Sequence, residues 1–562
     1  MSPPNDPLSR RGFLVASAGL VAAACGTDGA GEAPSTSTAA PSSTSTPTTT
    51  PTTTTPTTTA PTPPTPTVPT PEFTLDPFPY RTASGDPRHD SVVIWTRVAP
   101  EPLARDGGVD VSEVPVFWQL GALGDDAVLQ DGVFVTTEDH GHSVHVDVTG
   151  LDPSTDYWYR FSIGPHLTEG QTRTAPTPGA RTERLSFAVA NCNAYKSGYF
   201  TAYANMVDEE LDAVLFVGDY IYELEGGNTR DHGLELNPTT LDEYRAFYAV
   251  ARLDPDLAAC HQHHPWIVMW DDHEVEDNYA AWEPGGIGLQ IDANARENFR
   301  ARRIAAYQAW WEFMPVRTGP PVDGELALYR DFEFGDLAKL TVIDDRQYRS
   351  PIVQGKGDGD LPRPFGGGPQ LEGTFDESRT MLGAEQEAWF EQSIVSSATW
   401  SLLVQQTIMA EVDRAPENPD KGFSMDAWDG YAAPRERLLG FVHEHEIENF
   451  VVVGGDIHTS AVADLHVSYR EPDTPMVGTE FVAPSATSIE LLLPEFVEGS
   501  RSNDHIHLYE TEHRGYLRVD LTHDELTAHY RWVDTTAEPT SPIATASTWR
   551  IRSGTVGVEE IT

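Results

Sequence analysis

The sequence predicts an α/β domain with a layered sheet core, preceded by a small antiparallel β-sandwich. Four apolar runs without polar alternation indicate strands buried on both faces, and they read LSFAVANC, AVLFVGDYIY, WIVMWDDHE and FVVVGGDIH. Helical patterns are interleaved with these runs, which is the order of elements that builds a layered α/β domain. Upstream, short strand patterns follow one another without helices, as in an all-β sandwich.

Residues 1–30 are expected to be an export signal of the twin-arginine type. Arg10 and Arg11 precede an apolar stretch that ends in small residues and Cys25. We therefore expect a secreted protein, extracellular or at the cell surface, with the Tat export machinery as a partner. Cys25 is a candidate lipid attachment site; because Ala22 stands where a lipobox more often has leucine, cleavage without lipidation stays open.

Residues 31–72 are expected to form an extended stalk. The stretch 33–71 is almost entirely Pro, Ser and Thr and contains no charged or aromatic residue, so it cannot bury a core. Spacing the folded part from a cell surface is one use of such a segment, and an inert tether is the alternative.

Residues 73–176 predict a β-sandwich of the immunoglobulin or fibronectin type III class. Its strand patterns are SVVIWTRV, PVFWQLGA, GVFVTT, SVHVDVTGL and DYWYRFSIG, with turn clusters such as SGDPRHD and LDPSTD between them. Tyr157, Tyr159 and Phe161 alternate along the last strand, so they share one face and are expected in the core.

Residues 183–535 are expected to form the α/β domain. Its amphipathic helix patterns are ANARENFRARRIAAYQAWWEFMP, which Pro315 closes, AEQEAWFEQSIVSS and PRERLLGFVHEHEIEN. Residues 536–562 add an edge strand or lie as a tail, and the sequence leaves both open.

Composition argues against nucleic-acid binding. Lys and Arg number 37 against 86 Asp and Glu, and the formal charge of -49 repels nucleic acids and anionic lipid surfaces at long range. Three cysteines are too few for a disulfide framework. A disulfide between Cys192 and Cys260 is the alternative to a metal-binding role for Cys192.

Each of the four apolar runs ends in side chains that bind metal ions. These residues are Cys192, Asp219, Tyr222, Asp272, His273, Asp456 and His458. Strands buried on both faces lie side by side in a sheet, so the residues that follow them are expected to meet at one edge. Thiolate, phenolate, carboxylate and imidazole groups gathered there can hold two or more cations.

Five ordered motifs, SFAVANC, GDYIYE, WDDHEVEDN, IDDRQYRS and VVVGGDIHTSAVADL, resemble the PhoD-type alkaline phosphatases. That family is related to the purple acid phosphatases within the calcineurin-like metallophosphoesterases. The segment FPYRTASGDPRHDSVVIWTRV is similar to the family's N-terminal domain, so the resemblance covers the chain after the stalk. It implies an α/β/β/α sandwich and a secreted, metal-dependent alkaline phosphatase or phosphodiesterase that cleaves phosphate mono- or diesters with a metal-bound hydroxide.

The resemblance also implies a ligand set. An Fe³⁺ site would use Cys192, Asp219, Tyr222 and His458, and a Ca²⁺ site would use Asp219, Asp272 and Asp456. A phenolate suits ferric iron because a strong Lewis acid is needed to ionise tyrosine near neutral pH, and all-oxygen ligation favours calcium. An inert core cysteine and a hydrogen-bonded buried tyrosine are the alternatives for Cys192 and Tyr222.

Two further residues are expected to act on the substrate. By resemblance, His273 faces the bound phosphate and assists the leaving oxygen, and the guanidinium of Arg346 clamps phosphate oxygens. Asp271 would be a supporting acid, Arg349 an exposed surface residue, and Gln406 either a ligand or a core hydrogen-bonding group. The neighbouring histidines are expected in a solvated loop; they are His261, His263 and His264.

Two other functions fit parts of the pattern. A phospholipase D that acts on phospholipid headgroups would use the same motifs. A calcium-stabilised surface binding protein without activity would need the metal ligands but not His273 or Arg346. The sequence gives no basis for an oligomeric state.

Overall fold

The computed structural model describes residues 68–224, 226–285, 293–353, 370–418, 422–471, 473–489 and 492–562. The expected export signal with Cys25, and the stalk up to residue 67, lie outside the described residues. Among the helices of the described ranges, none combines the length and the apolar character needed to cross a membrane.

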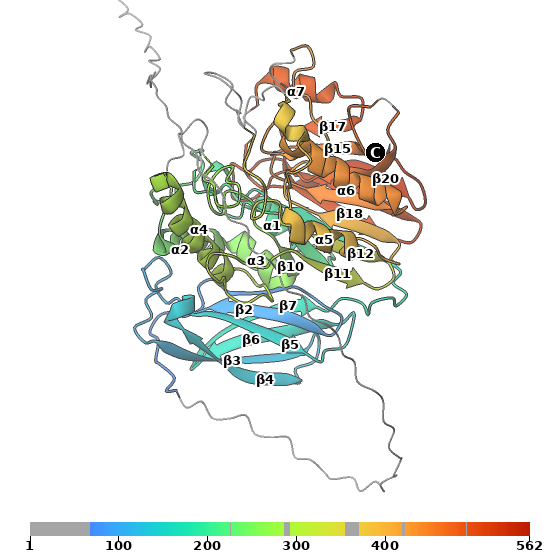
Figure 1. Cartoon of the computed structure of the whole chain (residues 1–562). Coiled ribbons are helices and arrows are strands. Elements are labelled where there is room, and N and C mark those ends of the chain that lie inside the picture. The colour runs from blue at the N-terminus through green and yellow to red at the C-terminus, as the bar shows by residue number, and fades with distance from the viewer. Residues whose placement is uncertain are drawn as a thin grey trace, which may run out of the picture. The chain divides into compact units, whose positions relative to one another are not determined.

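The described residues form three β-sheets (Figure 1). The first has ten strands in the order β21 (Glu559–Glu560), β20 (Ile543–Arg552), β19 (Glu525–Val533), β18 (Arg514–Leu521), β8 (Leu185–Ala190), β9 (Ala213–Phe216), β10 (Pro265–Val268), β1 (Thr82–Gly85), β2 (Ser91–Arg97) and β5 (Ser143–Thr149). The second has seven, β11 (Arg330–Phe334), β12 (Ala338–Val342), β13 (Trp400–Val404), β14 (Phe450–Gly454), β16 (Met476–Val482), β15 (Ser460–His466) and β17 (Ile506–Glu510). The third has four, β4 (Gln130–Thr137), β3 (Glu113–Ala122), β6 (Asp156–Ile163) and β7 (His166–Arg173).

Helices accompany the two larger sheets. Those of the described residues are α1 (Thr201–Met206), α2 (Leu241–Arg252), α3 (Pro255–His263), α4 (Ala293–Phe313), α5 (Gly383–Ser393), α6 (Ala432–Glu444) and α7 (Pro494–Arg501). Short 3₁₀ turns span Glu138–His140, Tyr195–Ser197, Glu372–Phe375 and Trp428–Tyr431. The three helix patterns read from the sequence correspond to α4, α5 and α6.

The two larger sheets stack against each other, with helices outside them. On β13 the side chain of Leu402 shares a core with Phe187 of β8, whereas the next residue, Leu403, shares a core with Phe390 of α5 and Leu439 of α6. On the other side of the molecule, α1 and α3 contact β18 and β1 of the ten-stranded sheet. Both faces of β13 are therefore covered, which explains its continuous apolar run, and the α/β/β/α prediction is confirmed.

The N-terminal strands form the predicted β-sandwich, and one of its sheets continues into the α/β part. Tyr157, Tyr159 and Phe161 of β6 are buried in the core that the four-stranded sheet shares with β2 and β5 of the ten-stranded sheet, as the alternation predicts. Strand β1 pairs antiparallel with β2 and parallel with β10, where Gly85 lies opposite Trp266. The ten-stranded sheet thus runs without a break from the sandwich to the α/β part.

The four apolar runs all form strands, but in two sheets. Strands β8, β9 and β10 are parallel neighbours in the ten-stranded sheet, while β14 belongs to the seven-stranded sheet. The expectation of a single sheet edge is therefore wrong. The donor residues come from the ends of two stacked sheets, because the apolar runs alone carry no information about which strands pair.

Candidate metal centre

The donor residues lie in tight turns directly after their strands. Their φ angles are positive: 59° at Cys192, 60° at Asp219, 65° at Asp456 and 54° at His458. These values fall in the left-handed region, which costs a residue other than glycine about 1–3 kcal/mol. The fold accepts this strain at four positions, and the side chains of all four point toward one centre.

Two glycines allow these turns to approach one another. A Cβ atom on Gly218 would lie 2.4 Å from Cβ of Asp271, and one on Gly455 would lie 2.6 Å from Cγ of Asn191. Both distances are far inside van der Waals contact, so no larger residue fits without moving the neighbouring strand end. The glycines therefore set how closely the donor-bearing turns pack.

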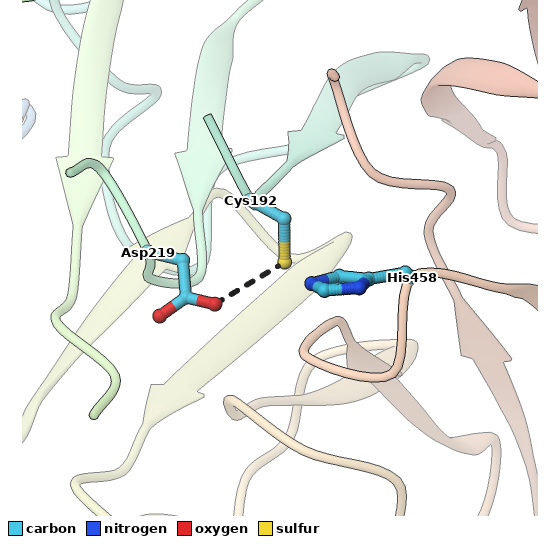
Figure 2. A group of neighbouring side chains, drawn as sticks. All are labelled: Cys192, Asp219 and His458. Atoms are coloured by element: carbon cyan, nitrogen blue, oxygen red, sulfur yellow. Dashed lines mark hydrogen bonds between the residues drawn. The ribbon is translucent and has the colours of Figure 1, made fainter. Parts of the chain in front are cut away.

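Figure 2 shows Cys192, Asp219 and His458 converging from three segments of the chain. One potential ligand atom from each lies within 4.8 Å of the others, and the Cys192 thiol donates to Oδ2 of Asp219 at 3.5 Å. The Tyr222 hydroxyl donates to the same Oδ2 at 2.9 Å and lies 2.8 Å from Nε2 of His458. Cys192 and Cys260 are both free thiols, so the disulfide alternative is wrong.

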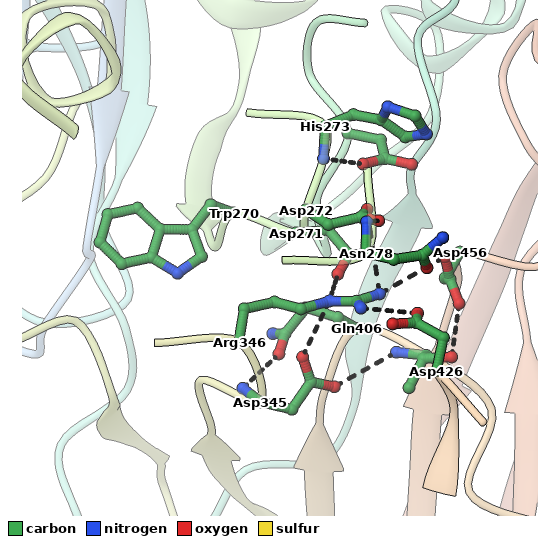
Figure 3. Close-up of polar contacts among 12 residues, drawn as sticks. Trp270, Asp271, Asp272, His273, Asn278, Asp345, Arg346, Gln406, Asp426 and Asp456 are labelled. Atoms are coloured by element: carbon green, nitrogen blue, oxygen red, sulfur yellow. Dashed lines mark hydrogen bonds and ion pairs between the residues drawn. The ribbon is translucent and has the colours of Figure 1, made fainter. Parts of the chain in front are cut away.

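Asp219 also belongs to a group of four carboxylates. One oxygen from each lies within 4.8 Å of the others, and the members are Asp219, Asp271, Asp272 and Asp456. Figure 3 shows the last three of these acids around Arg346. Oδ2 of Asp272 accepts the backbone N–H of Asn278 at 2.5 Å, which fixes that carboxylate. The structure thus brings the predicted sulfur and nitrogen donors to one side of Asp219 and oxygen donors to the other.

Arg346 is fully buried beside this acidic group. Its Nε donates to Asp271, and its Nη1 donates to Oδ2 of Asp426 at 2.6 Å (Figure 3). Its Nη2 lies 3.5 Å from Oδ1 of Asp456 and 3.9 Å from Oδ1 of Asp272. These surroundings differ from the phosphate-facing position expected from the sequence, because carboxylates accept from Nε and Nη1, and Nη2 is buried beside Asp456 and Asp272 without a hydrogen-bond partner among the described residues.

Two expectations about neighbouring residues need revision, those for Arg349 and His261, and for Gln406 the structure agrees with the core alternative. Arg349 is not exposed; it is buried and its Nη2 lies 2.6 Å from Oδ1 of Asp426. The Gln406 amide is engaged in the core, since its oxygen accepts from the backbone N–H of Asp345 and its nitrogen donates to a backbone carbonyl. His261 lies buried in α3 with Nε2 2.9 Å from the hydroxyl of Tyr220, so it is not part of a solvated loop.

The imidazole of His273 is held by an acid that the sequence analysis did not single out. Glu223 is buried, and its Oε2 lies 2.6 Å from Nδ1 of His273, while its Oε1 accepts the backbone N–H of Asp277 at 2.7 Å. Burial alone would lower the pKa of His273, but the carboxylates of Glu223, Asp272 and Asp219 outweigh it and raise the pKa well above its usual value. A signal was available, because Glu223 follows Tyr222 directly in GDYIYE.

A cavity of about 190 Å³ opens over the donors. Six of the predicted site residues line it, namely Asp219, Tyr222, Asp272, His273, Asp456 and His458. Cys192 is buried behind them. Asp277, Arg414 and Asp426 also line the cavity, and the sequence analysis did not single them out. Asp277 stands within the motif WDDHEVEDN, whereas Arg414 and Asp426 stand in loops without a recognisable motif.

The electrostatics of the site fit bound cations. Burial raises the pKa of Asp219 and Asp271 well above its usual value, nearby carboxylates add to the effect, and the pKa of Asp456 is raised to about 6. Burial and the Asp219 carboxylate also raise the pKa of Cys192 and Tyr222. A bound cation would compensate the negative charge that burial disfavours, and its binding would displace protons from groups whose pKa is raised. Sulfur, imidazole, phenol and carboxylate donors in one cluster are the chemistry that transition metals and calcium bind.

Comparisons with known proteins agree with this geometry. The family model for the PhoD-like phosphatase, N-terminal domain, matches residues 64–176, and the model for the PhoD-like phosphatase matches residues 187–530. Alkaline phosphatase D of Bacillus subtilis (strain 168) is 38% identical over 505 residues, which are 87% of this chain and 83% of that protein. A solved structure of PhoD matches with a TM-score of 0.80 and 37% sequence identity, covering 88% of this chain and 93% of that chain. The fold, the site and these matches together show that the chain belongs to the PhoD-like phosphatase family.

Proposed function

We propose that this chain hydrolyses phosphate mono- and diesters with Fe³⁺ and Ca²⁺ bound in the cavity that Asp219 lines. Family membership supports a phosphoric ester hydrolase and speaks against an inactive calcium-stabilised binding protein. One observation carries the placement of the metals: Asp219 belongs to each of the three groups of side chains that are close enough to share a cation. A carboxylate with two oxygens in that position would be able to hold two metals.

The chemistry of the donors supports the choice of metals. Cys192, Tyr222 and His458 offer sulfur, phenol and imidazole, which suit iron, whereas Asp272 and Asp456 offer only oxygen, which suits calcium. When bound, these cations supply Lewis acidity, which polarises the phosphoryl group and lowers the pKa of water.

The protein's own residues orient the substrate and move a proton. Glu223 engages Nδ1 of His273, so Nε2 is the ring nitrogen left to donate to the oxygen of the departing alcohol. Arg346 pairs with five carboxylates and is not among the residues that line the cavity, so we propose that it positions Asp271 and the metal-binding acids rather than the phosphate.

Metal removal tests the proposal directly. The metal-replete protein is expected to release p-nitrophenol at alkaline pH from p-nitrophenyl phosphate, bis(p-nitrophenyl) phosphate or both, and to lose this activity after chelation. Elemental analysis is expected to find iron and calcium. A visible charge-transfer band of an iron-bound phenolate is expected to disappear in Tyr222→Phe, which leaves any absorption of a Cys192 thiolate on iron in place. Full activity in a protein shown to be free of metal would refute the proposal.

Glu223→Gln is expected to lower kcat about 10- to 100-fold with little change in KM. The amide keeps the size of the side chain but removes the charge that holds His273 in its orientation and protonation state. Steady-state kinetics on p-nitrophenyl phosphate measure both constants. Glu276→Gln is the matched control: Glu276 stands in the same loop as His273 and pairs with Arg302, so near-normal kcat is expected. If the two variants have equal kcat, Glu223 does not contribute to catalysis through His273.

A further inference from the structure

The cavity is lined by two chemically different groups of side chains, which we call its apolar wall and its acidic floor. The larger apolar side chains that line it are Leu224, Ile457, Ile489 and Leu492. The floor carries Asp219, Asp272 and Asp456. A substrate that reaches the metal-binding groups therefore meets two chemically different surfaces.

The apolar wall is built onto the metal-binding groups themselves. Ile457 stands between Asp456 and His458, so its position is set by the same turn that places both donors. The backbone carbonyl oxygen of Ile489 lies 3.0 Å from Nδ1 of His458, within hydrogen-bond distance of the imidazole. Leu224 follows Tyr222 by two residues. Three of the wall residues, Leu224, Ile457 and Ile489, are thus linked closely to a group proposed to bind metal.

Two of these four side chains are exposed to solvent, and the other two pack against the hydrophobic core. Leu224 is 50% exposed and Ile489 is 48% exposed, so both present apolar surface to solvent at the cavity. Ile457 and Leu492 pack against the hydrophobic core that α5 and α6 share with the seven-stranded sheet. An exposed apolar surface continuous with a binding cavity is the arrangement that an apolar ligand group covers.

We propose that this wall binds an alkyl substituent of a phosphodiester, and the inference rests on the proposed function. A cavity of about 190 Å³ accommodates the phosphoryl group and the atoms next to it, so a longer substituent extends along Leu224 and Ile489. The four wall side chains offer no hydrogen bond, and a polyhydroxylated substituent would lose its hydrogen bonds to water there without replacement. Burial of methylene groups on the same surface is favourable.

A series of p-nitrophenyl alkyl phosphodiesters tests this inference. The leaving group is the same in the methyl, butyl and octyl esters, so only the contact of the alkyl group changes. For the metal-replete wild-type protein, kcat/KM is expected to rise at least about 10-fold from methyl to butyl. In Leu224→Ser and Ile489→Ser, the butyl-to-methyl ratio is expected to fall to within about 3-fold of one. Because the ratio compares two substrates of one preparation, differences in metal loading cancel.

Leu129→Ser is the matched control, since Leu129 is a 58% exposed leucine at the start of β4, away from the residues that line the cavity. It is expected to keep the wild-type ratio. A wild-type ratio near one, or the same ratio in the wall variants and the wild type, overturns the inference and leaves the proposed function standing. Failure of the metal-replete protein to cleave any phosphate ester overturns both.

Discussion

Replacing Asp219 with asparagine is expected to lower kcat/KM for phosphate esters at least about 10³-fold. The amide has nearly the same shape but carries no charge, and it cannot bridge two cations. Asp219 contacts the Cys192 thiol and the Tyr222 hydroxyl through Oδ2, and its Oδ1 accepts the backbone N–H of His273 at 3.3 Å. The substitution therefore affects both halves of the site, and elemental analysis is expected to show loss of metal together with loss of activity.

A second aspartate beside the same strand provides the control. Asp212 precedes β9, whereas Asp219 follows it, and the Asp212 carboxylate accepts the backbone N–H of Ser186 at 2.9 Å and pairs with Arg173 at 3.3 Å. Asp212→Asn is expected to keep metal content and kcat/KM close to those of the wild type. If Asp219→Asn retains its metals and more than a tenth of the activity, another residue must be the bridge.

Arg346→Met is expected to lower the free energy of unfolding by about 3–5 kcal/mol. Methionine fills much of the space, but Asp271 loses the Arg346 donor and Asp426 keeps only Arg349 as a charged partner, and removing one partner of a buried ion pair leaves an uncompensated charge. Urea unfolding measures the loss. Arg346→Lys is expected to recover only part of it, because a single ammonium group cannot reach several carboxylates as a guanidinium does.

A substitution at Arg435 is the control that distinguishes the loss of stability caused by removing any buried arginine from a specific effect on the metal site. It is also buried, and it pairs with Asp429 at 2.7 Å and Glu411 at 3.0 Å. Arg435→Met is expected to be destabilised to a similar degree but to keep its metal content, whereas folded Arg346→Met is expected to bind less metal. Should Arg346→Met unfold like the wild type and show only a raised KM, Arg346 would contact the substrate, as the sequence first suggested.

The strands and the donor residues could be predicted because the information is local. An apolar run such as FVVVG specifies a buried strand, and the polar residue that follows it, such as Asp456, must emerge at the strand end. The layered fold follows from the alternation of such runs with helices. For these features, neighbouring residues in sequence determine the outcome.

The surroundings of Arg346 could not be predicted in the same way. Asp271 is 75 residues away and Asp426 is 80 residues away in sequence, and Asp426 lies in a loop without a motif. The pairing of β1 with β10 could not be predicted from the sequence for a similar reason. The segment TASG is short and weakly apolar, and it becomes a central strand only because neighbours on both sides supply its hydrogen bonds. Both features depend on tertiary contacts that local patterns do not encode.

The left-handed turns at Cys192, Asp219, Asp456 and His458 imply that the donor atoms are directed by the polypeptide before any ion arrives. Because residues other than glycine keep such conformations only when the surrounding structure enforces them, the chain acts as a rigid template. Selection among metals would then follow the fixed spacing of the donor atoms. A demetallated protein is expected to keep the same left-handed turns and the same spacing.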